Sequence, residues 1–415
     1  MKQTLAEKII SEHAGHDVQA GDIAIVEVDG AMATDATAPF AIKAFKEMGG
    51  TKLWNADKVS LILDHATPAP NERVANLHQL MREFAGETGC YFYDVGEGIC
   101  HQLMVENAHV RPGHIFVGAD SHTPTYGALG AFAVGMGSTD TAGVMLTGQT
   151  WLKVPQTIKL VLMGRVNPGV SAKDIILHIV GKLGIAGATY DAVEFTGEVV
   201  HAMTLASRMT LANMVAEMGA KTALVDTTNL SLPYDFTPRR SDEGATYKAV
   251  HDLDLSDLRP QVAVPHSPDQ VVDIDEVLGR KIDAAFIGSC TNARLEDLQA
   301  AAEVVRGRTL SVRLVIAPAS RNVFNAALKD GTIQTLSEAG ATFITSGCGP
   351  CVGTHQGIPG DGEAVISSTN RNFRGRQGNP KAEIYLASPA VVAAAAVAGK
   401  IIDPAELVGD VGVLA

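Results

Sequence analysis

The chain has 415 residues, of which 46% are hydrophobic and 19% are charged, and 41 of them are glycines. This length exceeds one typical domain, so two or three are expected. Thirty-three basic residues against 46 acidic ones give a net charge of −13, which disfavours nonspecific binding to nucleic acid or to anionic lipid. The longest apolar stretches, such as 391–397, are too short to span a bilayer.

Acidic residues interrupt the apolar run near the N-terminus, so we expect no signal peptide. The chain also has five cysteines, an odd number. A disulfide framework is therefore unexpected, and a reducing cytoplasm fits better. The cysteines are Cys90, Cys100, Cys290, Cys348 and Cys351.

Helical and short apolar patterns alternate through residues 1–153, which we predict to form a first α/β domain. The expected helices are 1–20, 35–48 and 71–86, and the expected strands are 23–28, 59–63, 91–95 and 115–117. The stretch from Gly127 to Gly148 is rich in glycine and small residues, which indicates close packing or a loop against a buried site.

Two further α/β domains are predicted over residues 154–280 and 281–415. The second has expected strands at 158–163, 192–195 and 222–225 and helices at 172–181 and 203–218, and the third begins with a strand at 282–287. Residues 228–270 are rich in Pro, Asp and Ser and have little periodicity, so we interpret them as the interdomain connection. The fold class is α/β, with three domains of mostly parallel sheets around a central cleft.

One arrangement occurs five times: a short apolar strand ends and chemically useful polar residues follow at once. The five stretches are LILDH (61–65), IFVGADSHT (115–123), AAFIGSCTN (284–292), TFITSGCGPC (342–351) and AVISSTNRNF (364–373). In parallel sheets, ligands bind beyond the carboxyl ends of the strands, so these five ends predict one composite active site.

Cys348 and Cys351 form a Cys-x-x-Cys loop between glycines, which brings two thiolates toward one soft metal centre. Alone, this motif fits half a zinc site, a redox dithiol or part of an iron–sulfur cluster. Cys290 follows a strand in a similar setting, and its interpretation as a third ligand or as a small buried residue stays open at this point. We interpret Cys90 and Cys100 as inert.

Histidines and carboxylates also follow the predicted strands. Carboxylate–imidazole pairs can keep a histidine protonated and able to give a proton to a leaving hydroxyl, although many such histidines are surface or core residues. The candidates are Asp64, His65, His101, Asp120, His122 and Glu194.

Three arginines, Arg371, Arg374 and Arg376, lie within six residues after the last of the five strands. Arginine binds carboxylates in a bidentate manner, and a solvated surface loop is the alternative. We favour carboxylate binding for Arg371 and Arg376, and we interpret Arg374 as a bystander.

Together and in this order, LILDH, GADSHT, GSCTN, GCGPCVG and SSTNRNFRGR resemble the aconitase superfamily of iron–sulfur hydro-lyases, and the resemblance extends to residues 203–222. In length, the chain is similar to the free-standing large subunits of this family, which cover three of the four aconitase domains.

The resemblance implies one 4Fe–4S cluster held by Cys290, Cys348 and Cys351. It implies that Asp64 and His65 protonate a departing hydroxyl. The implied supporting pairs are His101 with Asp120 and His122 with Glu194, and the implied substrate-binding residues are Arg371 and Arg376, with Ser121 and Asn370 nearby.

Two departures from the family pattern matter. The proton-abstracting serine of the family, with a neighbouring arginine, belongs to the fourth domain, so the resemblance implies a separate small subunit that completes the site in a heterodimer or heterotetramer. Near Asp35, aconitases proper carry a glutamine that this chain lacks, which weakens citrate as the substrate. A cluster-sensing RNA-binding protein and a zinc-stabilised structural protein are the alternatives from other functional classes.

Overall fold

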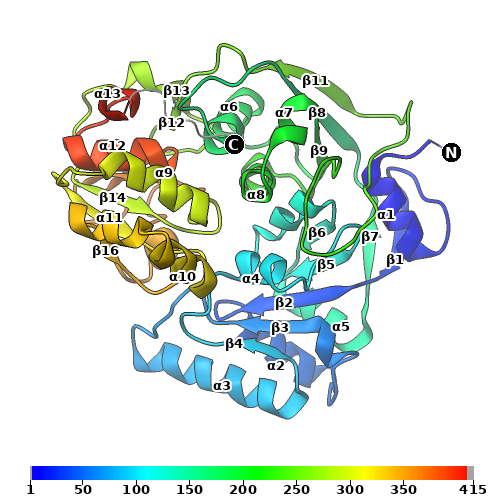
Figure 1. The fold of residues 1–415 in the computed structure, drawn as a ribbon. Coiled ribbons are helices and arrows are strands. Elements are labelled where there is room, and N and C mark those ends of the chain that lie inside the picture. Colours follow the sequence, from blue (N-terminus) through cyan, green and yellow to red (C-terminus); the bar gives the residue numbers. More distant parts are fainter. Residues whose placement is uncertain (1, 409–415) are drawn as a thin grey trace.

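The computed structural model describes residues 2–408 and builds them into three larger β-sheets and one two-stranded ribbon. Figure 1 shows helices packed around each larger sheet, with the three sheets grouped around the middle of the molecule. The α/β class with mostly parallel strands is therefore confirmed.

The first sheet has the strand order β4-β3-β2-β5-β6, and all of its strand pairs are parallel. Its strands are β2 (Gly30–Thr34), β3 (Val59–Ile62), β4 (Tyr91–Tyr93), β5 (Ile115–Gly118) and β6 (Phe132–Gly135). The accompanying helices are α2 (Ala38–Glu47), η1 (Ala56–Lys58), α3 (Glu72–Thr88), α4 (Cys100–Glu106), η2 (Thr123–Leu129) and α5 (Ser138–Thr147).

The predicted close packing of the glycine-rich stretch is confirmed in η2. A side chain at Gly127 would collide with the backbone carbonyl of Ala223 in the second sheet. Because only glycine leaves room for this approach, η2 packs directly on the strand that contains Ala223. This contact joins the first and second sheets.

The second sheet has the order β10-β9-β8-β11, again entirely parallel. Its strands are β8 (Thr157–Met163), β9 (Ala192–Thr196), β10 (Thr222–Val225) and β11 (Ala249–Asp254). The helices are α6 (Ala172–Leu183), α7 (Glu198–Ala202), α8 (Leu205–Met214) and η3 (Val215–Met218). The prediction that 228–270 is only a connection is wrong, because β11 forms an edge of this sheet.

The third sheet has the order β13-β12-β18-β17-β14-β15-β16, parallel except where β12 pairs with β13 and β18. Its strands are β12 (Gln261–Ala263), β13 (Val271–Asp273), β14 (Ala284–Ile287), β15 (Arg313–Ile316), β16 (Thr342–Phe343), β17 (Ala364–Ser367) and β18 (Glu383–Leu386). The helices are η4 (Ile274–Glu276), α9 (Leu295–Val305), α10 (Arg321–Lys329), α11 (Thr332–Ala339), η5 (Gly349–Val352), α12 (Pro389–Ala398) and α13 (Ala405–Val408).

The division between the second and third sheets does not fall at the predicted boundary after residue 280. Residues 261–273 supply two strands of the third sheet although they precede that boundary. The short, weakly periodic strands β12 and β13 explain the error, since three-residue strands carry little pattern.

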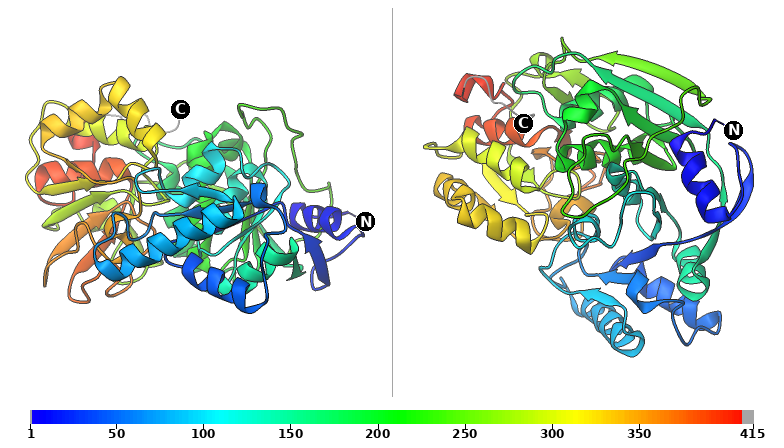
Figure 2. Two further views of the ribbon diagram at one scale, coloured as in Figure 1. Left: turned by 90° about the horizontal axis from the view of Figure 1, so that it is seen from below. Right: turned by 45° about the vertical axis from the view of Figure 1, so that its right-hand side comes forward.

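The ribbon pairs β1 (Ile23–Glu27) with β7 (Gln149–Lys153) in antiparallel fashion, and α1 (Leu5–Ala14) packs beside it. In both views of Figure 2 this ribbon lies at the end of the molecule away from the yellow-to-red third sheet. No helix within residues 2–408 has the length and apolar character needed to cross a bilayer.

Candidate active site

A pocket of about 620 Å³ lies where the three sheets meet, and side chains after all five predicted strand ends line it. The predicted residues in its lining are His65, His101, Asp120, Ser121, His122, Cys290, Cys348, Cys351, Asn370, Arg371 and Arg376. Asp64 lies directly behind this lining, while Glu194 lies elsewhere. The side chains that follow the five strand ends therefore meet in one pocket, as expected.

His65 lies between two carboxylates. Its Nδ1 is 2.7 Å from Oδ1 of Asp64 and its Nε2 is 3.3 Å from Oδ2 of Asp120. Burial, the largest effect, lowers the pKa of His65, but the charges and hydrogen bonds of the two carboxylates raise it well above the usual 6.5. His65 is therefore an imidazolium that donates from both nitrogens.

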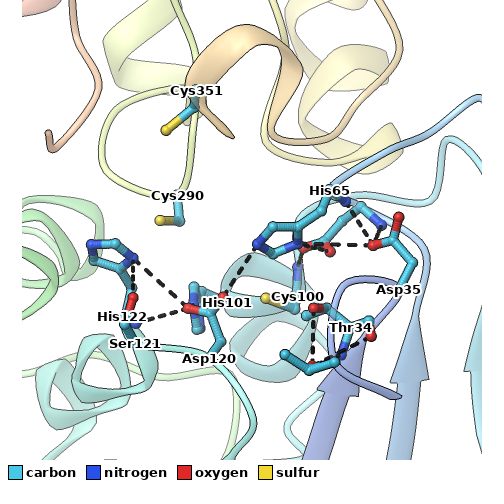
Figure 3. Close-up of polar contacts among 12 residues, drawn as sticks. Thr34, Asp35, His65, Cys100, His101, Asp120, Ser121, His122, Cys290 and Cys351 are labelled. Carbon is cyan, nitrogen blue, oxygen red and sulfur yellow. Dashed lines mark hydrogen bonds and ion pairs between the residues drawn. The ribbon is translucent and has the colours of Figure 1, made fainter. Parts of the chain in front are cut away.

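Asp35, at the end of β2, fixes the backbone that carries this histidine. Its carboxylate accepts the amides of Asp64, His65 and Ala66 at 3.2, 2.8 and 2.7 Å, and the imidazole Nε2 of His78 lies at 3.3 Å. Burial raises the pKa of Asp35, but these hydrogen bonds and the charge of His65 lower it to about 2. Figure 3 shows Asp35 behind the His65 loop.

Asp120 connects His65 to a second histidine, as predicted for the pair His101–Asp120. Its Oδ1 lies 2.8 Å from Nε2 of His101, and Nδ1 of His101 lies 3.2 Å from the hydroxyl of Tyr126. Burial raises the pKa of Asp120, but the hydrogen bonds and charges of His101 and His65 hold it well below 3.8. The shared carboxylate is therefore ionised.

His122 has a different environment. Its Nε2 lies 2.9 Å from Oε1 of Glu217, and its Nδ1 lies 3.4 Å from Oγ of Ser121. Arg371 closes the ring, with Nε donating to both Glu217 oxygens at 2.9 Å and Nη1 donating to Ser121 at 3.1 Å. Burial and the charge of Arg371 lower the pKa of His122 to about 4, so this histidine is neutral and donates to Glu217.

The predicted pairing of His122 with Glu194 is wrong. Glu194 lies in β9, where Ser241 and Tyr247 donate to its carboxylate at 2.6 and 3.1 Å. Burial raises the pKa of Glu194, and the site pocket does not include it. The partner of His122 comes instead from η3, the continuation of helix α8.

The three predicted cysteines are buried on the loops after β14 and β16, and Figure 3 shows Cys290 and Cys351 above the histidines. The side-chain amides of Asn213 and Asn370 donate to Sγ of Cys290 at 3.1 and 3.4 Å. Burial raises the pKa of Cys290 to about 12. Burial raises the pKa of Cys348 as well, to well above 9.0. Buried thiols that are hard to ionise, as at Cys290 and Cys348, fit a site where a metal group supplies the compensating charge.

The three cysteine sulfurs do not all lie within 4.8 Å of one another. Within residues 2–408, the group of three candidate ligand atoms lying within 4.8 Å of one another belongs to Asp64, His65 and Cys348, and not to the three cysteines. Thiolates on a single Zn²⁺ would lie about 4 Å apart, given a Zn–S bond of roughly 2.3 Å. Asp64 and His65 are already hydrogen-bonded to each other, so their closeness is explained without a metal.

Arg376 also faces the cysteines. Burial lowers the pKa of Arg376, but the charge of Cys351 outweighs this and raises it. Its buried Nε has no hydrogen-bond partner among the described residues, as expected of a group positioned for a ligand. Arg374 instead donates to the carbonyl of Pro380 on the surface, in agreement with its interpretation as a bystander.

Two buried cations hold the loops of the site from behind. Nζ of Lys173 donates to the carbonyls of Ser368 and Thr369 at 2.8 and 2.6 Å, directly before Asn370. Arg294 donates to the carbonyls of Cys290 and Thr291 at 2.8 and 2.7 Å. Burial lowers the pKa of Lys173 to about 7.

The sequence profile of the aconitase family (aconitate hydratase) matches residues 7–240 and 276–399, most of the chain. The chain belongs to the aconitase family.

Among aconitase-family proteins, this chain is 49% identical to "3-isopropylmalate dehydratase large subunit 1" of Methanopyrus kandleri, over 97% of this chain and 99% of that one. It is 48% identical to the "3-isopropylmalate dehydratase large subunit" of Elusimicrobium minutum, over 98% and 100%. It is 44% identical to the "probable methanogen homoaconitase large subunit" of Methanothermobacter thermautotrophicus, over 99% of both chains.

Among solved structures, the holo-form of aconitase X from Thermococcus kodakaraensis is similar, with a TM-score of 0.53 and 14% identity over 84% of each chain. At this identity the likeness supports the fold alone. It agrees with the α/β architecture described above.

Sequence reasoning missed several residues of this aconitase-family site. Glu217 and Asn213 are polar residues in the largely apolar stretch 203–218, and that contrast was a readable signal. Lys173 and Arg294 gave no such signal. The carbonyl that Lys173 binds lies far away in the sequence, and the bond from Arg294 to the carbonyl of Cys290 depends on the geometry of the loop.

Proposed function

We propose that this chain is the catalytic large subunit of a 3-isopropylmalate dehydratase, which interconverts 2- and 3-isopropylmalate in leucine biosynthesis by dehydration and rehydration. One observation carries the proposal: a histidine held protonated between two carboxylates shares one pocket with three cysteines and two arginines. The names of relatives at 46–49% identity over nearly the whole chain supply the substrate.

We assign one 4Fe–4S cluster to Cys290, Cys348 and Cys351. Three thiolate ligands would leave one iron open, and when bound, this cluster supplies a Lewis acid for the substrate hydroxyl. The amides of Asn213 and Asn370 would stay hydrogen-bonded to sulfur, which tunes such clusters. The donor set supports this assignment, since all three thiols are buried and line the same pocket.

His65 is the proposed general acid. Dehydration removes a hydroxyl from one carbon and a proton from its neighbour, and the hydroxyl leaves as water once it is protonated. The imidazolium of His65 holds that proton, and Asp64 and Asp120 stabilise the charge and fix the ring on both sides. His101 orients Asp120 from behind.

Arg371 and Arg376 are the proposed carboxylate-binding residues. Arg371 is fixed by Glu217 and Ser121, so its guanidinium is positioned before substrate arrives. Neutral His122 completes that hydrogen-bonded ring without adding a positive charge directly beside Arg371. Asn370 lies next to Arg371 in the pocket lining and contributes to the same end of the site.

The base that removes the carbon-bound proton is proposed to come from a separate small subunit. The names of the relatives state that they are large subunits, which supports a partner chain. We also propose a cytoplasmic location, supported by five cysteines that are all free thiols.

Homoaconitase is the second candidate, because a relative with that name is 44% identical over 99% of both chains. A methylmalate-type hydro-lyase is a further variant of the same chemistry. Neither an RNA-binding protein nor a zinc-stabilised structural protein explains an imidazolium that shares one pocket with two arginines.

The test is an assay of the chain, copurified with its small subunit under anaerobic conditions, on isopropylmalate, homocitrate and citraconate side by side. We expect isopropylmalate to have the highest kcat/KM. Activity restricted to homocitrate and homoaconitate would overturn the leucine assignment in favour of homoaconitase.

A further inference from the structure

An exposed apolar patch lies on the outer face of the β1–β7 ribbon. Ile23, Ile25 and Trp151 are 71%, 67% and 63% exposed, and Ile25 lies directly opposite Trp151 in the antiparallel register. The alternate residues of β1, Ala24 and Val26, are buried in the core, so the exposed side chains share one face. We call Ile23, Ile25 and Trp151 the ribbon patch.

Large apolar side chains exposed side by side are typical of interaction sites. The ribbon patch is also rigid, because the opposite face of β1 packs on α1 and the first sheet. A rigid exposed tryptophan beside two isoleucines is the composition expected of an interface centre, where aromatic residues contribute most of the binding free energy.

Two contacts, one of them through Tyr190, connect the ribbon to the rim of the active-site pocket. Tyr190 donates from its hydroxyl to the carbonyl of Lys153 in β7 at 3.4 Å, and Nζ of Lys221, which lines the pocket, lies 5.4 Å from the Tyr190 ring centroid. Thr150 of β7 contacts Sδ of Met136, another lining residue, at 3.8 Å. The ribbon therefore borders the pocket through two separate contacts.

The pocket is open on this side. Ser121 and Gly219 line it and are exposed, and Met136, Ala220 and Lys221 are half-buried. A chain that closes the pocket must cover these residues, and its edge then reaches the ribbon.

We propose that the ribbon patch is a docking surface for the small subunit, an inference that rests on the proposed function for the existence of that partner. Lys153 lies opposite Ile23 in the ribbon and Lys221 lines the pocket, so the facing surface of the small subunit is expected to be apolar with carboxylates at its edge. Docking there closes the open side of the pocket and brings the missing base toward His65.

The experiment compares three forms of the chain: wild type, the double variant Ile25→Asp/Trp151→Ala, and the control Leu328→Asp. Leu328 is also an exposed apolar residue, 55% exposed, but it lies on α10 beside the third sheet, at the other end of the molecule. Each form is titrated with the separately expressed small subunit of the same organism by isothermal calorimetry, and circular dichroism and thermal melting check the fold.

We expect the double variant to bind the small subunit roughly 30-fold or more weakly, as for removal of an interface centre, while Leu328→Asp binds like wild type. At limiting small subunit, hydro-lyase activity should fall in the same proportion and recover when excess small subunit is added. Equal affinity of the folded double variant and wild type would overturn the proposal.

Two further outcomes test separately which chain binds the patch and whether the proposed function holds. If sedimentation shows that the double variant instead changes the mass of the large chain alone, the patch binds a second copy and the proposal is overturned. If wild type binds the small subunit through the patch but hydrates none of the three substrates, the docking surface stands and the proposed function fails.

Discussion

The pocket contains two histidine–carboxylate centres that look alike and differ in charge. His65 lies 2.7 Å from Asp64, and His122 lies 2.9 Å from Glu217. The pKa of His65 is nevertheless raised well above 6.5, whereas that of His122 is lowered to about 4.

The neighbours of each pair explain the difference. His65 has a second carboxylate, Asp120, at its other nitrogen. His122 has the cation Arg371 nearby, which binds the same Glu217 carboxylate and takes up its charge. A histidine–acid pair therefore becomes a proton donor only where no cation competes for the acid. The His65 centre serves as the acid, and the His122 centre holds Arg371 for carboxylate binding.

The largest expected effect comes from removing the acid. His65→Asn should lower kcat by roughly 100- to 10,000-fold, the range for loss of a general acid, while substrate affinity changes little. Steady-state kinetics with saturating small subunit measures it. A variant with kcat near that of wild type would show that the His65 centre does not supply the acid.

The next prediction concerns Asp35, which holds the backbone of the His65 loop. The pKa of Asp35 falls from 3.8 to about 2 in the folded chain, which corresponds to about 2 kcal/mol of stability at neutral pH. Because the folded value is depressed, this stability is present above pH 4 and is lost as the pH falls toward 2. Asp35→Asn should therefore lower the free energy of unfolding at pH 7 and make it depend less on pH between 4 and 2.5.

Denaturant unfolding at several pH values checks this prediction. Asp57→Asn is the matched control, since Asp57 is exposed in η1 near the same sheet. An equal loss in both variants would show that Asp35 has no special role in the His65 loop.

The next prediction compares Glu217, the carboxylate beside His122, with Glu194, the partner predicted from the sequence. Glu217→Gln should raise KM about tenfold, an effect of about 1.4 kcal/mol, because Arg371 loses the ionised partner that positions it. Glu194→Gln, at a buried acid bonded to Ser241 and Tyr247, should leave KM unchanged. A larger effect on KM at Glu194 than at Glu217 would restore the original pairing.

The smallest effect is a change in proton affinity. Arg371→Met removes the cation that lowers the pKa of His122, so this pKa should rise while that of His65 stays high. A histidine NMR titration of the variant and wild type measures both. An unchanged His122 would mean that burial alone, and not Arg371, keeps it neutral.

Sequence reasoning reached the pocket and the pairs Asp64–His65 and His101–Asp120, but it did not find the partner of His122. The strand-end motifs placed His65, Asp120, Cys290, Cys348 and Arg371 together, because parallel strands deliver their ends to one edge. It failed at Glu194, whose position inside a strand resembles a motif, while the geometry of α8 and η3 brings Glu217 to His122. Long-range contacts such as Lys173 to Ser368 leave no local pattern.

The central claim is that three cysteines hold a cluster with one site open to substrate. The most direct measurement is iron, sulfide and zinc analysis, with the visible spectrum, of the chain purified without oxygen, beside Cys351→Ser. We expect about four irons and four sulfides per chain, with a broad visible band that Cys351→Ser loses while it keeps its fold. Zinc without iron or sulfide, and no visible absorption, would contradict it.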